Sequence, residues 1–145
     1  MAVYNKFQDF IEQVFRAVHN FGSHTYKVAL TNTAPVNTQT GLDTVTNHPP
    51  PANVNGYTAG GTATTIAISE TGGTVTVTGT QVVFTASGGT LGAFRYVILY
   101  NDSATSPADA LVSWWDYASS ITLADGETFT VKFNNTSPGN IFTAS

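Results

Sequence analysis

Few side chains in this sequence have the type and spacing that catalysis or metal binding requires. His19 and His24 lie five residues apart, so they do not share the i, i+4 face of a zinc-protease helix, and His48 is remote from both. There is no Cys, which excludes disulfides and cysteine-based zinc sites. A nucleophile elbow and a P-loop are both missing. We therefore expect no enzyme activity, no metal and no cofactor.

The carboxylates offer only a weak case for acid-base chemistry. A glycosidase needs two carboxyl groups at a defined separation. Four Asp residues lie mostly near predicted turns, where capping the turn backbone is their expected role. They are Asp102, Asp109, Asp116 and Asp125.

Trp114 and Trp115 are better suited to binding than to catalysis. Adjacent residues of a strand point to opposite faces, so one Trp can fill the core while the other faces the second side. Trp and Tyr are common in binding hot spots. Three interpretations stay open: both rings are covered within the fold, one contacts another subunit, or one forms a platform on which a sugar stacks.

The composition excludes several classes of protein. The 145 residues suit one domain, 1–145, that buries a real core. Only 10% are charged, against about a quarter on average, while the 41% hydrophobic content argues against disorder. Five Lys and Arg against nine Asp and Glu predict no nucleic-acid partner. With neither a signal peptide nor a membrane span, we expect a soluble chain made in a cytoplasm.

Residues 4–20 have the only helical period, with Asn5 as the expected N-cap and Gly22 as the expected stop. Apolar residues recur at i, i+3, i+4 and i+7 along one wide stripe, which predicts an amphipathic helix. The stripe consists of Tyr4, Phe7, Phe10, Ile11, Val14, Phe15 and Val18. It packs on the protein's own sheet, or part of it docks on another subunit.

After Gly22 the apolar period changes to two, which predicts strands. The segment 96–100 is apolar on both parities, so we expect a central strand that is covered on both faces. Pairs such as Gly72-Gly73 and Asn101-Asp102 are predicted turns. Expected strands span 25–31, 62–69, 74–78, 81–86, 94–100, 110–117, 120–123, 127–133 and 141–143. The prediction is a mainly β protein: an antiparallel β-sandwich or jelly-roll-like domain, mostly from 62–145, with the N-terminal helix packed on it.

The segment 32–61 interrupts this rhythm. It contains Pro49, Pro50 and Pro51, which favour extended polyproline II, and the Gly-rich stretch around Tyr57. A long segment without secondary structure in a small domain is usually functional or disordered. We expect an extended arm that lies across a neighbouring subunit, or a surface loop.

Several segments together resemble a family of small structural proteins of tailed bacteriophages. The similarity runs from about residue 4 to about residue 133. It rests on residues 4–7, 18–22, 27–35, 56–61, 84–89, 94–96, 99–102, 115–117 and 125–131. The resemblance implies a virion component without catalytic residues.

The leading hypothesis is a capsid decoration, or cement, protein that bridges capsid subunits on the outside of the head. Its partners would be the major capsid protein and copies of itself, as a homo-oligomer on the particle, with no membrane partner. The candidate subunit contacts are Phe7, Phe10, Phe15, Pro49, Pro50, Pro51, Tyr57, Trp114 and Trp115. The alternatives are a carbohydrate-binding module for host recognition on a tail or fibre and, more remotely, a hydrolase of the host envelope.

Overall fold

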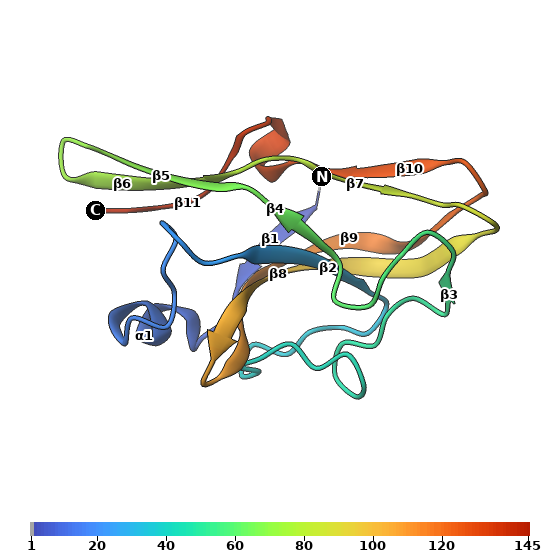
Figure 1. Ribbon diagram of the computed structural model, residues 1–145, viewed down its shortest axis with the longest axis horizontal. Coiled ribbons are helices and arrows are strands. Elements are labelled where there is room, and N and C mark those ends of the chain that lie inside the picture. Colours follow the sequence, from blue (N-terminus) through green and yellow to red (C-terminus); the bar gives the residue numbers. More distant parts are fainter. Residues whose placement is uncertain (1) are drawn as a thin grey trace.

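A long antiparallel hairpin of β8 (Leu91–Thr105) and β9 (Ala108–Leu123) forms the centre of the structure (Figure 1). The computed structural model describes residues 2–145. Three strands extend this hairpin into a sheet of order β1-β9-β8-β2-β4, and β3 pairs with one end of β8. The bounds of these four strands are β1 (Val3–Lys6), β2 (Tyr26–Thr31), β3 (Asn53–Val54) and β4 (Thr62–Thr64).

A second layer of shorter strands lies over this sheet (Figure 1). It contains a three-stranded sheet of order β11-β6-β5 and the pair β10-β7. All pairings in both layers are antiparallel. The strands are β5 (Ile66–Thr71), β6 (Thr74–Gly79), β7 (Val82–Thr85), β10 (Thr128–Val131) and β11 (Gly139–Ala144). A short 3-10 turn, η1 (Phe133–Asn135), connects β10 to β11. The mainly β, antiparallel prediction is therefore confirmed.

The core consists of two clusters of buried side chains, one on each face of the β8-β9 hairpin. Val97 and Leu99 belong to the larger cluster between the layers, and Tyr96, Ile98 and Tyr100 belong to the smaller one. The predicted double-sided burial of segment 96–100 is confirmed. Such burial explains why the segment 96–100 is apolar at every position, since neither of its faces meets water.

The predicted helix over 4–20 is wrong at both ends. Residues Val3–Lys6 form β1, which pairs with β9, and the helix α1 spans only Phe10–Phe15. Its N-cap is Asp9 rather than Asn5. The helix ends at Phe15. Two residues later Ala17 has φ 61°, its N–H donates to Val14 O, and Val18 N–H donates to Gln13 O. These two bonds form a Schellman motif, which stops the helix well before Gly22.

The short helix nevertheless packs on the sheets, through Phe10. This side chain is 1% exposed, and its ring lies near the rings of His19, Phe21 and Phe142. No helix within residues 2–145 is long and apolar enough to cross a membrane.

The turn between β5 and β6 is the predicted Gly72-Gly73 pair. Both glycines have positive φ, 59° and 84°, as a two-residue type I′ hairpin requires. By contrast, Asn101-Asp102 is not a turn, because β8 continues to Thr105 and reverses at Ser106-Pro107. The Asn101 side chain explains the difference: its Oδ1 accepts from Ser103 N–H and its Nδ2 donates to Val18 O. The side chain thus joins a local bond to a long-range one, and the strand continues.

The segment 32–61 returns to its own sheet. Thr40 O accepts from Leu111 N–H at 2.9 Å and Leu42 N–H donates to Asp109 O at 2.9 Å, so the segment runs beside the start of β9. Leu42 packs against the smaller core cluster. His48 and Pro51 are buried. The part of the segment around Leu42 is thus a loop over the outer face of the main sheet, below it in Figure 1, whereas Tyr57 belongs to the larger cluster between the layers.

A buried histidine organises the tip of this loop. Asp43 N–H donates to His48 Nδ1 at 3.2 Å, which leaves His48 Nε2 as the donor to Gln39 Oε1 at 2.9 Å. The Asp43 carboxylate accepts from the N–H groups of Val45 and Thr46. Burial lowers the pKa of His48, which favours this neutral form.

Candidate functional site

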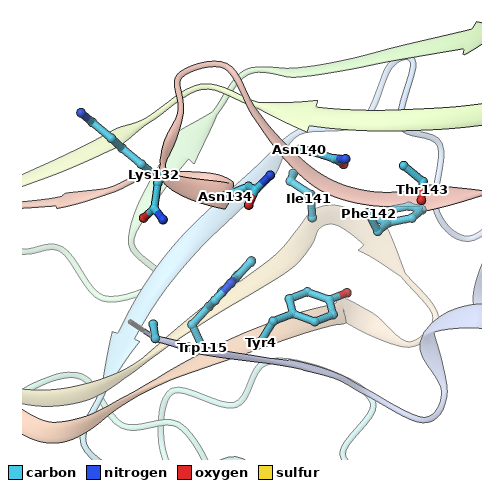
Figure 2. A pocket seen from close by; sticks show the side chains of 10 residues that line it. Tyr4, Trp115, Lys132, Asn134, Asn140, Ile141, Phe142 and Thr143 are labelled. Atoms are coloured by element: carbon cyan, nitrogen blue, oxygen red, sulfur yellow. The ribbon is translucent and has the colours of Figure 1, made fainter.

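Aromatic and amide side chains surround a hollow where the two layers meet near the N-terminal strand. A hollow of about 310 Å³ is bounded by β1 and β9 on one side and by η1 and β11 on the other (Figure 2). Tyr4 and Trp115 form its aromatic wall, and Asn134 and Asn140 lie opposite. Its volume is that of a small-molecule site.

The aromatic wall is held by packing on both sides of Trp115. Tyr4 and Trp115 are cross-strand partners in the β1-β9 pairing, and their rings meet edge to face at 5.5 Å. The Trp115 ring also lies 5.4 Å from Phe133 of η1. Trp115 is half-buried, so its ring is fixed while part of it faces the hollow. Burial raises the pKa of the Tyr4 hydroxyl, which stays a neutral hydrogen-bonding group.

The opposite wall depends on an unusual turn. Asn134 and Asn135 both have left-handed backbones, with φ 50° and 59°. Asn is one of the few residues other than Gly that adopt this conformation readily. The turn exposes both Asn side chains and brings Lys132 to the rim of the hollow. A tight left-handed turn therefore places two amides and one cation beside the aromatic wall.

Asn140 contributes a buried acceptor. Its Oδ1 atom is inaccessible to solvent and has no hydrogen-bond partner in the protein. Asn140 belongs to β11 and lines the hollow. A buried polar atom without a partner costs about 1–3 kcal/mol of folding stability.

A second hollow of about 450 Å³ continues from the first. Lys132 and Asn135 line both, and Tyr117 and Thr130 line the second alone. Trp115 and Tyr117 are two residues apart in β9 and lie on the same face of that strand. We call the combined surface the Trp115 groove, made of Tyr4, Trp115, Tyr117, Lys132, Asn134, Asn135 and Asn140. Among residues 2–145, no carboxylate lines either hollow.

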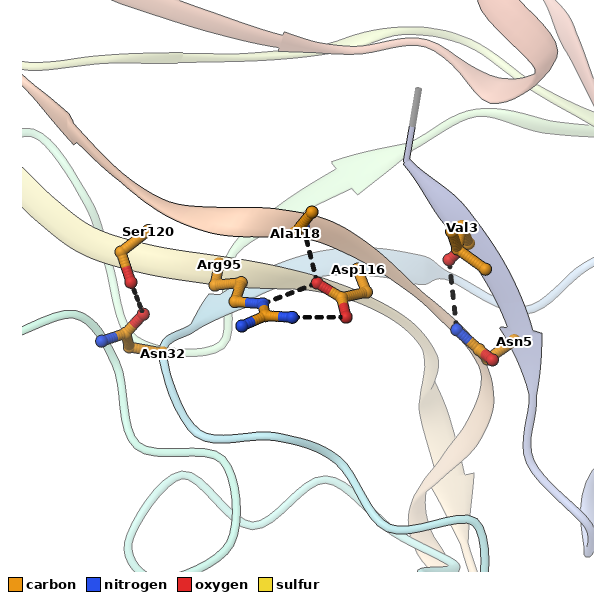
Figure 3. A network of polar contacts seen from close by, with 7 residues as sticks. All are labelled: Val3, Asn5, Asn32, Arg95, Asp116, Ala118 and Ser120. Atoms are coloured by element: carbon orange, nitrogen blue, oxygen red, sulfur yellow. Dashed lines mark hydrogen bonds and ion pairs between the residues drawn. The ribbon is translucent and has the colours of Figure 1, made fainter.

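An ion pair on the other face of β9 fixes the backbone between the two groove aromatics. The Arg95 guanidinium bonds both oxygens of Asp116, Nε to Oδ1 at 2.7 Å and Nη2 to Oδ2 at 2.9 Å (Figure 3). Asp116 Oδ1 also accepts from Ala118 N–H, and Ala118 has φ 66°. The Arg95 hydrogen bonds lower the pKa of Asp116, so the carboxylate stays charged. Asp116 is therefore a positioning residue of this strand.

The structure separates the two tryptophans as their adjacency in a strand predicts. Trp114 is 7% exposed and packs in the smaller core cluster, with its ring 4.5 Å from that of Phe7. Trp115 lies on the opposite face. Trp114 therefore cannot share a sugar platform with Trp115.

The remaining candidate contact residues divide between the interior and the surface. Phe7, Phe10 and Tyr57 are at most 7% exposed, which leaves them no surface for another subunit. Pro51 is buried, and Pro49 and Pro50 are half-buried. Phe15 is 87% exposed on α1. Of the nine candidates, only Trp115 lines the groove.

In the folded chain, His19 and His24 both lie beside the Asn101 side chain, which is distant from them in sequence. Asn101 Nδ2 lies 3.0 Å from both Val18 O and His24 Nδ1, and 3.5 Å from His19 Nδ1. Burial, then the charge of His24, lower the pKa of His19 to about 4. His19 Nε2 is buried without a partner. Residues 2–145 contain no group of three or more His, Cys, Asp or Glu that could hold a metal.

The sequence alone does not predict most residues of the Trp115 groove. The helical period places Tyr4 on a helix stripe, and nothing local indicates that Lys132 and Asn134 lie near Trp115. The signal that could have been used is Asn134-Asn135 before Thr-Ser-Pro-Gly, a sequence typical of a left-handed turn.

Comparison of the chain with protein-family models, with curated proteins and with solved structures finds no match.

Proposed function

We propose that this chain is a structural protein of a tailed-bacteriophage virion, and that it acts as a capsid decoration protein. In this proposal its two layers form a β-sandwich of the jelly-roll type, and it sits on the head, bridging capsid subunits. Its partners are the major capsid protein and copies of itself, with neither nucleic acid nor membrane, and it performs no catalysis. The resemblance of residues 4–133 to small virion proteins supports this role.

The observation that carries the proposal is the apolar outer face of α1. Phe15 is 87% and Ile11 40% exposed, and the two lie at i and i+4, on one face of the helix. Single exposed apolar residues need no explanation, but adjacent ones form a patch. If a neighbouring subunit covers α1, the Phe15 side chain is removed from water, and burial of this apolar surface favours the contact.

Further apolar side chains face solvent on other elements. Val45 is 86%, Val3 60% and Ile68 52% exposed, and they belong to the loop, β1 and β5. Because few of its residues are charged, covering several sides of the domain removes few charged groups from water and costs little desolvation free energy. Weak contacts repeated around a shell give stability through multivalency.

The test combines copy number with binding to heads. Mass spectrometry of purified virions should find many copies per head, and purified protein should bind heads that lack it and raise their temperature of disruption. Phe15→Ser should reduce this binding, while Val83→Ser, on the exposed side of β7, serves as the matched control. A few copies confined to the tail would overturn the proposal and favour the host-recognition alternative.

A further inference from the structure

We propose that the Trp115 groove binds an acidic oligosaccharide, of the uronic acid class, with the sugar rings against Trp115 and Tyr117 and a sugar carboxylate at Lys132. This binding activity goes beyond the proposed decoration role and does not depend on it. It follows from three features of the groove: its walls, its amides and its charge.

The walls match the amphipathic character of a sugar. Trp115, Tyr4 and Tyr117 offer apolar rings with polar tips, and sugars present C–H faces edged by hydroxyls. The rings are held in place by the packing of Trp115 on Phe133 and of Tyr117 on Phe129, at 5.4 Å and 5.2 Å. Pre-ordered aromatic walls lose little conformational entropy when a ligand binds.

The opposite wall supplies hydrogen bonds of both kinds. Asn134 and Asn135 each offer two N–H donors and a carbonyl acceptor, which suits hydroxyl groups that donate and accept. The left-handed turn presents both amides outward from η1. A purely apolar ligand would leave these groups without partners, which disfavours it.

The charge of the groove favours a ligand that carries a carboxylate. Lys132 is exposed where the two hollows join, and it takes part in none of the ion pairs of residues 2–145, which involve Arg16, Lys27 and Arg95. With no carboxylate in the described lining, the groove is locally positive on a chain of net charge −4. A ligand carboxylate would gain a charge-assisted hydrogen bond from Lys132.

The test uses the full chain and the two Trp indole N–H signals in NMR spectra. Tetragalacturonate should shift the Trp115 signal and leave that of Trp114, which is buried on the other face of β9, unchanged. Maltotetraose, a neutral tetrasaccharide, should bind at least about tenfold more weakly, as expected for loss of one charged hydrogen bond.

Two variants assign the binding to the groove without disturbing the core. Lys132→Gln should weaken tetragalacturonate binding about tenfold and remove the preference over maltotetraose. Arg16→Gln removes the same charge at an exposed site on the C-terminal end of α1 and should leave binding unchanged. Three results would overturn the proposal: no Trp115 shift with tetragalacturonate, equal affinity for both tetrasaccharides, or equal shifts with sodium sulfate alone.

Discussion

Trp114 and Trp115 are consecutive in β9 and face opposite sides of the main sheet. Trp114 lies against Phe7, 4.5 Å between ring centroids, beneath the 32–61 loop, and Trp115 lies against Phe133, at 5.4 Å, between the layers. One residue is therefore part of the interior and the other part of the groove. Their different surroundings lead directly to different expectations for their removal.

Replacing Trp114 should destabilise the fold more than replacing Trp115. Trp114→Ala leaves a cavity in the smaller core cluster and should lower the free energy of unfolding by about 3–5 kcal/mol. Trp115→Ala should cost less, because that side chain is only half-buried. Urea unfolding of the two variants checks this order, and equal losses would contradict it.

Two phenylalanines of α1 should behave differently although the sequence assigns them to one stripe. Phe10 is 1% exposed, so Phe10→Ala should cost about 3–5 kcal/mol of stability. Phe15 is 87% exposed, so Phe15→Ala should change stability by no more than about 0.5 kcal/mol. Thermal and urea unfolding measure both. A large loss for Phe15→Ala would show that α1 packs with its other face inward.

The hydroxyl of Tyr57 should stabilise the edge of the main sheet by accepting a buried backbone hydrogen bond. The β4 pairing with β2 stops at Val28, and beyond it Leu30 N–H donates to Tyr57 Oη at 2.9 Å, in the interior. Tyr57→Phe leaves this buried N–H without a partner and should cost about 1–3 kcal/mol. Tyr4→Phe, at a 40% exposed position, is the control and should cost less in the same unfolding assay.

Stability should fall as the pH drops from 6.5 towards 4, chiefly because of His19. Its pKa is about 4 in the folded protein and ordinarily 6.5, so the unfolded chain takes up the proton first. The contribution of His19 is fully present above pH 6.5. Its loss towards pH 4 amounts to roughly 3 kcal/mol at most. His48, whose pKa is also lowered, acts in the same direction.

NMR titration of the three histidine rings and unfolding at several pH values test this prediction. His19→Gln should flatten the pH dependence between 6.5 and 4. The paired carboxylate of Asp116 has a lowered pKa, so its contribution is lost only below its ordinary value of 3.8, in a separate window. A His19 ring that titrates near 6.5 would contradict the buried, neutral state.

Much of the β structure could be predicted because its signals are local. Alternation marked β6, the doubly apolar run marked the centre of β8, and Gly72-Gly73 marked a hairpin, since each depends on neighbours within a few residues. The merging of 110–117 and 120–123 into β9 was not visible, because it depends on pairing with β8 across a bulge.

The candidate site was predictable only at Trp115. Strand periodicity placed the two tryptophans on opposite faces, but it could not say which face would be closed by Phe7 and Leu42 and which would stay open beside Asn134. The histidine pair shows the same limit, because His19 and His24 meet through Asn101, about eighty residues away in the chain.

The sequence by itself determined that this protein is mainly β, low in charge and free of Cys, and that a helix lies near its N-terminus, although the predicted helix was too long. These properties follow from composition and from periods of two and 3.6, which act within a single element. Tertiary structure alone decided that Val3–Lys6 is a strand, that the loop around Leu42 covers a sheet, and that Tyr4, Trp115 and Lys132 share a groove. The physical reason is that strand pairing and burial join residues distant in sequence, and their free energy outweighs local preference.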